Sequence, residues 1–231
     1  MHHSGLQRHP GRLAAAGGVV LLLAVTSGSA AGIQPPAAGE PAVRVVVVGD
    51  SLSTGHGTSP QQAWPALMRT DPGVAGLAVV NAAEDGSGYV SPGDRGGTFD
   101  TEVEDFVTPD TGIVVFFGSE NDLGYAPADV GDAALAAMDR AEALAPAARI
   151  IVVGPPSYTA EPDPGLVDLN HQLRTAARQA GGEFVDPIAE GWISDDVDDL
   201  IGPDGDHPTV LGQHYLLEHI GAHLQQAAPA S

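Results

Sequence analysis

Residues 43–52 read Val-Arg-Val-Val-Val-Val-Gly-Asp-Ser-Leu, and this stretch decides the fold. Its first six residues form a short, β-branched apolar run interrupted only by Arg44, which predicts a strand buried on both faces of a parallel sheet. Gly49 follows the run, and glycine lets the backbone turn sharply there. The sequence therefore predicts a buried strand that delivers Asp50 and Ser51 to the end of a sheet.

The rest of the chain alternates strand-like and helix-like segments, which is typical of a parallel sheet covered on both faces. We expect a three-layer α/β/α sandwich with a five-stranded, doubly wound parallel sheet. In such folds the ligand site lies at the carboxyl ends of the strands. The further strands are expected over 77–81, 113–117, 149–153 and 183–185, and the helices over 63–70, 101–107, 128–145, 166–180 and 210–225.

Composition limits the possible partners. With 231 residues, of which 43% are hydrophobic and 17% charged, the chain can fill the core of one domain. Thirty acidic residues stand against nine basic ones, all arginine, for a net charge of −21. This charge argues against nucleic acid or an anionic membrane as a partner. The absence of cysteine excludes disulfides, a thiolate nucleophile and a cysteine-based zinc site.

The N-terminus has the pattern of a secretory signal peptide. Arg8 and Arg12 precede an apolar run over 13–25, and small residues follow. We expect a signal peptide over 1–31, cleaved near Ala30 or Ala31, a flexible linker over 32–41 and one domain over 42–231. The protein is then secreted or associated with the cell envelope, without stable membrane insertion after cleavage. An uncleaved N-terminal anchor is the alternative.

Two loops after the first strands carry candidate catalytic groups. Ser51 lies where a strand passes into a helix, a position suited to a nucleophile, although a serine or aspartate there also caps helices. The loop after the second strand contains Gly86 and Gly88, either of which can turn a backbone N–H toward the same site as an oxyanion donor. The alternative for this loop is an ordinary flexible turn.

Two later loops add an amide and an imidazole. Asn121 follows the third strand, where its side chain can donate to an oxyanion or merely shape a turn, as can that of Asp122. Asp204 precedes His207 by three residues in a tight turn, so it can hold the imidazole while Nε2 acts as a general base. His56, between two glycines near Ser51, is the rival base.

The order Ser, Gly, Asn, His at successive strand ends closely resembles the SGNH hydrolases, the GDSL-type esterases and lipases of bacteria. The resemblance runs from Val43 to the last helix and implies their flavodoxin-like fold. It assigns the nucleophile and one oxyanion donor to Ser51. The other two oxyanion donors are Gly86, with Gly88 as an alternative, and Asn121. The remaining catalytic pair is Asp204 and His207. One difference is that the third block is Gly-x-x-Asn-Asp here, not the usual Gly-x-Asn-Asp.

The resemblance implies acyl transfer through an acyl-serine intermediate. His207 takes the Ser51 proton, an oxyanion forms against the donors of Ser51, Gly86 and Asn121, and water releases the acid. Asp204 orients His207. The mechanism requires neither a metal nor an organic cofactor, and water is the second substrate.

Two functions of other classes stay open at this point. Asp50, Asn121, Asp206 and His207 resemble part of the hard-metal site of a metallophosphoesterase, although further histidines are missing from the middle blocks. A catalytically inactive binding module is also conceivable, because a fold does not fix a function.

Aromatic residues point to the substrate. Tyr89, Tyr125 and Tyr158 fall in loops at the expected rim of the site, where they can pack against sugar rings or short apolar groups. The neighbouring loops are polar and lack an apolar lid for a long acyl chain. We therefore expect short acyl esters, acetyl above all, with a glycan or small molecule as the carrier. A lipase, lysophospholipase or thioesterase is the alternative, and the sequence does not indicate an oligomeric state.

Overall fold

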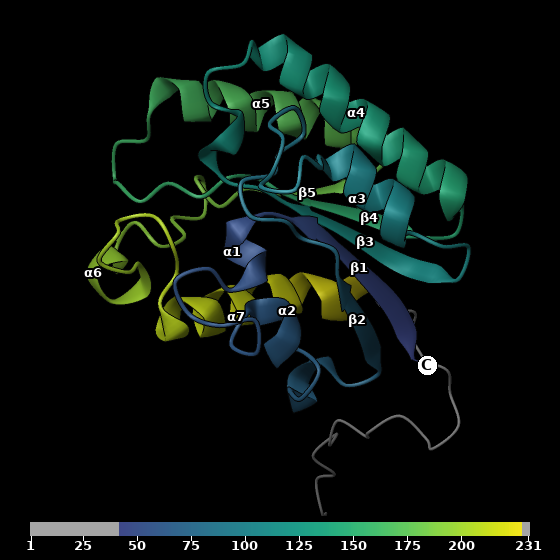
Figure 1. The fold of residues 1–231 in the computed structure, drawn as a ribbon, viewed down its shortest axis with the longest axis horizontal. Coiled ribbons are helices and arrows are strands. Elements are labelled where there is room, and N and C mark those ends of the chain that lie inside the picture. The colour runs from purple at the N-terminus through teal and green to yellow at the C-terminus, as the bar shows by residue number, and fades with distance from the viewer. Residues whose placement is uncertain (1–41, 228–231) are drawn as a thin grey trace, which may run out of the picture. The chain divides into compact units, whose positions relative to one another are not determined.

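The sheet has the predicted doubly wound architecture. The computed structural model describes residues 42–227, so the predicted signal peptide and linker lie outside the described residues. Five parallel strands pair in the order β2-β1-β3-β4-β5 (Figure 1). The predicted α/β fold class is confirmed, and the strands are β1 (Val43–Gly49), β2 (Leu77–Asn81), β3 (Thr111–Phe117), β4 (Arg149–Val153) and β5 (Glu183–Val185).

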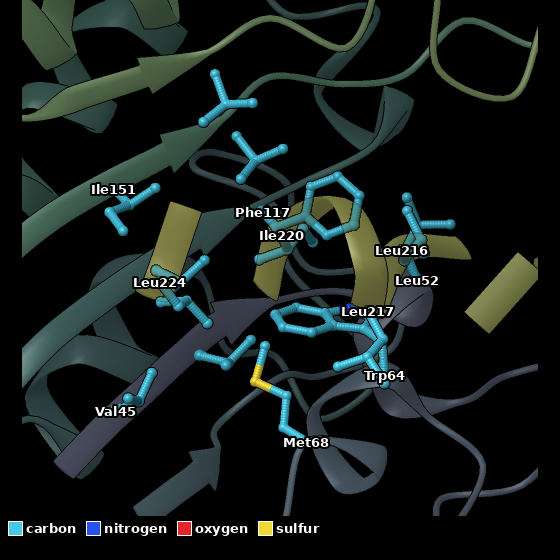
Figure 2. Close-up of a cluster of buried hydrophobic side chains, with 14 of the residues drawn as sticks. Val45, Leu52, Trp64, Met68, Phe117, Ile151, Leu216, Leu217, Ile220 and Leu224 are labelled. Carbon is cyan, nitrogen blue, oxygen red and sulfur yellow. The ribbon is translucent and has the colours of Figure 1, made fainter. Parts of the chain in front are cut away.

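The valines of β1 build both halves of the core. Val45 and Val47 face one side of the sheet, and Val46 and Val48 face the other, because successive side chains of a strand alternate. All four are fully buried. Figure 2 shows the hydrophobic cluster on the face of Val45 and Val47, to which Trp64 and Leu216 also belong. This packing buries β1 between the helices on the two faces of the sheet.

Helices cover both faces, and the longer ones match the sequence prediction closely. On one face lie α3 (Phe99–Phe106), α4 (Pro127–Leu144) and α5 (Pro164–Gln179), and on the other α2 (Trp64–Leu67) and α7 (Val210–Ala227) (Figure 1). The helix predicted over 63–70 is shorter than expected, since only α2 is regular and turns follow it. None of the helices in the described part of the chain is long and apolar enough to cross a membrane.

Four short elements lie outside the predicted ranges, although a helix was expected to begin near Ser51. They are the helices α1 (Ser51–Thr54) and α6 (Val197–Leu200) and the 3-10 turns η1 (Pro72–Val74) and η2 (Glu120–Asp122). Elements of three or four residues are too short to show a hydrophobic period, so the sequence does not reveal them. Two of them, α1 and η2, carry candidate site residues.

Candidate active site

Ser51 begins a helix directly after the carboxyl end of β1. Asp50 caps this helix, α1, by accepting a hydrogen bond from the Leu52 N–H at 2.9 Å. The N–H groups of the first helical turn have no acceptor within the helix, so the Ser51 N–H remains available to a ligand. The Ser51 side chain is largely buried, with the residue 8% exposed. Hydroxyl and backbone donor therefore lie together at one strand end.

Asp50 links α1 to the third loop, and the sequence did not indicate this connection. One carboxylate oxygen accepts from Leu52, and the other accepts from the Ser119 N–H at 2.7 Å and the Asn121 Nδ2 at 3.2 Å. Burial raises the pKa of Asp50 to about 6, although the hydrogen bonds from Leu52 and Ser119 oppose the shift. The residue thus fixes the relative position of Ser51 and Asn121.

The surroundings of Asp50 do not suit a metal ligand. Its three hydrogen bonds come from N–H donors, which a cation would have to displace. Within residues 42–227 no three His, Asp or Glu side chains converge on one point. The geometry therefore gives no support to the metallophosphoesterase alternative.

The second loop distinguishes Gly86 from Gly88. The Gly88 N–H donates to the Ser91 carbonyl at 2.9 Å, so it is already committed. Gly86 has a φ of +77°, and no acceptor for its N–H is found among residues 42–227. A side chain at Gly88 would collide with the Asp122 carboxylate, its Cβ lying 2.6 Å from Oδ1. Of the two N–H groups, that of Gly86 is therefore the one without an acceptor in residues 42–227.

The extra residue of the third loop is accommodated by the 3-10 turn η2. This turn brings the Asn121 side chain back over the second loop, where Nδ2 donates to the Ser87 carbonyl at 2.9 Å. Asp122 accepts hydrogen bonds from the N–H groups of Tyr89 and Ser91, both at 2.8 Å. Asp122 thus shapes the second loop, while Asn121 lies between that loop and Asp50.

His207 is held by Asp204 within its own turn. Nδ1 lies 3.0 Å from Asp204 Oδ2, and Oδ1 accepts from the N–H groups of Asp206 and His207 at 3.1 Å each. These backbone hydrogen bonds are the main reason that the pKa of Asp204 falls to about 2, so the carboxylate stays ionised. His207 packs on the turn after α1, since a Cβ added at Gly57 would lie 3.0 Å from the Cβ of His207.

A second histidine and aspartate lie against this pair. His56 Nδ1 is 2.9 Å from Asp85 Oδ2, and the rings of His56 and His207 have centroids 4.1 Å apart. The hydrogen bond to Asp85 raises the pKa of His56. The sequence did not indicate this pair because its members are 29 residues apart and meet only through the fold.

The three tyrosines predicted to line the site lie in different environments. Tyr89 is only 5% exposed and packs edge-on against Phe99, with ring centroids 4.7 Å apart, so its predicted contact with substrate is wrong. Its loop folds inward because Asp122 binds the backbone there. Tyr158 is partly buried and donates to the Asp206 carbonyl at 3.0 Å. Tyr125 is 42% exposed beside the third loop.

Comparison with known proteins identifies the family. A model of the GDSL-like lipase/acylhydrolase family matches residues 47–215, which include every candidate catalytic residue. The chain belongs to this family. It is therefore a carboxylic ester hydrolase, and the resemblance inferred from the sequence is confirmed.

Individual relatives agree with this assignment. A GDSL lipase of Mycobacterium tuberculosis is 40% identical over 184 residues, which cover 76% of this chain and 79% of that protein. Among solved structures, TesA superposes with a TM-score of 0.67 at 24% identity, covering 80% of this chain and 99% of its own. Est24, a carbohydrate acetylesterase from Sinorhizobium meliloti, has a TM-score of 0.63 at 17% identity. The match covers 80% of this chain and 100% of Est24. The two structures share the fold.

Replacing Asn121 tests the oxyanion assignment. We expect Asn121→Ala to lower kcat by about 10²–10³, the usual effect of losing one oxyanion donor, with KM much less affected. Steady-state kinetics on a p-nitrophenyl ester measures both constants. An unchanged kcat would remove Asn121 from the site. Asp122→Ala is not a neutral control, because it releases the second loop as well.

Proposed function

We propose that the protein is a secreted serine esterase whose nucleophile is Ser51 and whose substrates are short-chain acyl esters, acetyl esters above all. The observation that carries the catalytic assignment is the set of donors around Ser51. Two backbone N–H groups without acceptors in residues 42–227, those of Ser51 and Gly86, lie at adjoining strand ends. The two hydrogens of the Asn121 amide face Asp50 and the Ser87 carbonyl, so the longer bond, the 3.2 Å one to Asp50, must break for Asn121 to act as the third donor. Such a set suits the oxyanion of acyl transfer.

In the proposed mechanism, His207 accepts the hydroxyl proton of Ser51 as the oxygen attacks the ester carbonyl. The carbonyl becomes an oxyanion, which the three donors stabilise. His207 then gives the proton to the leaving alcohol, and the C–O bond to the alcohol breaks. Water attacks the acyl-serine with His207 again as base, which releases the acid and restores Ser51. Asp204, an ionised carboxylate, stabilises the imidazolium formed twice in this cycle.

The preference for short acyl groups rests on the surface beside the third loop. Leu123 and Tyr125, which directly follow η2, are 38% and 42% exposed. They offer a small apolar and aromatic surface, enough for a methyl group or one face of a sugar ring. With Tyr89 assigned to the core, Tyr125 is the main candidate for stacking. Est24, a fold relative, acts on carbohydrate acetyl esters by its name, which supports a glycan as carrier.

A chain-length series tests this substrate class. We expect kcat/KM to fall from p-nitrophenyl acetate through butyrate to decanoate, because the apolar surface beside Asn121 is small. Acetylated xylan should release acetate, and Tyr125→Ala should slow that release more than it slows hydrolysis of p-nitrophenyl acetate. A maximum at decanoate would favour the lipase or lysophospholipase alternative, and a preference for acyl thioesters would favour a thioesterase.

Secretion rests on the sequence pattern of residues 1–31. The test is the N-terminal sequence of the protein recovered from the culture medium of an expressing bacterium. A start at Ala31 or Gly32 supports cleavage, whereas protein that keeps Met1 and stays with the cells supports the uncleaved anchor.

A further inference from the structure

Glu102 is a buried carboxyl group for which the catalytic mechanism has no use. It lies on α3 and is 4% exposed. Its Oε2 accepts a hydrogen bond from the Gly49 N–H at 2.8 Å, and its Oε1 lies 2.8 Å from the Ser87 hydroxyl. Gly49 precedes the Asp50-Ser51 pair, and Ser87 follows Gly86. One side chain therefore joins the strand end that carries the nucleophile to the loop that carries a second oxyanion donor.

The number of hydrogens around Ser87 favours the neutral form of this carboxyl group. The Ser87 hydroxyl lies 2.9 Å from the Gly49 carbonyl, 2.8 Å from the Glu84 carbonyl and 2.8 Å from Glu102. A hydroxyl has a single hydrogen, so three acceptors cannot all be satisfied. If Glu102 is neutral, its own O–H donates to Ser87, and Ser87 donates to one of the two carbonyls. The neutral acid therefore leaves one of the three short contacts of the Ser87 hydroxyl without a hydrogen, whereas the ionised acid leaves two.

The charges near Glu102 favour the same form. Burial is the main reason that its pKa rises to about 9, and the carboxylates of Asp50 and Glu84 raise it further. Arg95 pairs with Glu84, and its side chain is 73% exposed. Glu102 thus faces negative groups, and the hydrogen bonds that its ionised form would accept from Gly49 and Ser87 only partly offset their effect.

The link continues to the third oxyanion donor. The Ser87 carbonyl accepts a hydrogen bond from the Asn121 amide at 2.9 Å. Glu102 and Ser87 therefore connect the segments that carry Ser51, Gly86 and Asn121. We propose that Glu102 is a positioning residue, which as a neutral carboxylic acid holds these three segments in register. The inference rests on the proposed function, because it assumes that those donors bind the oxyanion.

Three variants measure this role. Glu102→Ala should lower kcat by about 10–100-fold, since displacement of catalytic groups by about 1 Å has effects of this size, with KM changed much less. Glu102→Gln should keep nearly all activity, because its amide oxygen can accept from Gly49 while its NH₂ donates to Ser87. The matched control is Glu104→Ala, an exposed acid of the same helix, which should leave kcat unchanged.

Stability against pH gives a readout independent of catalysis. In the folded chain Glu102 keeps its proton up to a pH of about 9, whereas in the unfolded chain it loses the proton near its ordinary value. Between these values the folded state binds more protons, so its stability falls as pH rises. Glu102→Gln cannot show this fall. The Tm of Glu102→Gln minus that of the wild type should therefore be larger at pH 8 than at pH 5.

The outcomes separate this inference from the proposed function. A Glu102→Ala variant as active as Glu104→Ala would overturn the positioning role, provided that Ser51→Ala is inactive. A Glu102→Gln variant as impaired as Glu102→Ala, or a Tm difference that does not change with pH, would overturn the neutral form. A fully active Ser51→Ala variant would instead contradict the proposed function itself. Retained activity in Glu102→Gln with loss in Glu102→Ala supports the inference.

Discussion

Ser51→Ala is expected to lower kcat for ester hydrolysis by about 10⁴–10⁶, because the reaction loses the atom that forms the covalent intermediate. The fold should survive. The Ser51 carbonyl, which alanine retains, accepts the hydrogen bond from the Thr54 hydroxyl at 3.3 Å, and Asp50 caps α1 independently of the Ser51 side chain. Hydrolysis of p-nitrophenyl acetate and thermal unfolding, measured on the same preparation, check both parts.

The neighbouring serine provides the matched control. Ser53 is fully buried, and its hydroxyl accepts a hydrogen bond from the Trp64 indole at 3.1 Å. Ser53→Ala should therefore lower Tm more than Ser51→Ala while keeping far more activity. An active Ser51→Ala variant beside an inactive, well-folded Ser53→Ala variant would show that the nucleophile was assigned to the wrong residue.

His207→Ala is expected to have the second largest effect, a loss of about 10⁴-fold or more in kcat, since it removes the general base and acid. His56→Ala should cost much less, because His56 contacts the His207 ring but lies in a pair of its own with Asp85. Steady-state kinetics of the two variants from pH 5 to pH 9 compares them directly.

The same experiment distinguishes the two histidines by their pH profiles. In the wild type, kcat/KM should rise with pH as the base loses its proton. His56→Ala should retain this rise, whereas the residual activity of His207→Ala should lack it. If the rise disappears in His56→Ala and persists in His207→Ala, the general base is the histidine paired with Asp85.

The sequence was sufficient to predict the sheet and the loops that carry the site. Buried parallel strands leave a strong local signal, and the ranges of β2, β4 and β5 were predicted to the residue. The turn of Asp204 and His207 was also readable, because its two members are only three residues apart. Local patterns of this kind do not depend on how the chain packs.

Features made by contacts between distant segments could not be read in advance. Tyr89 was expected at the rim, but the hydrogen bond from its N–H to Asp122, 33 residues away, belongs to a network that turns the loop inward. The pairing of His56 with Asp85 depends on a similar long-range contact. The sequence gives no local sign of the contact between Glu102 and Gly49, which lie 53 residues apart, and only the folded chain reveals it. In each case a partner from another loop or strand determines the role of the residue.

Covalent labelling of the nucleophile tests the central claim most directly. The purified protein is treated with a p-nitrophenyl alkylphosphonate, which phosphonylates activated serines, and the modified residue is identified by peptide mass spectrometry. We predict one phosphonyl group per chain, on Ser51, with loss of esterase activity in proportion to labelling and no labelling of Ser51→Ala. Complete inactivation with the label on Ser53 or another residue, or full activity in protein labelled on Ser51, would contradict the account.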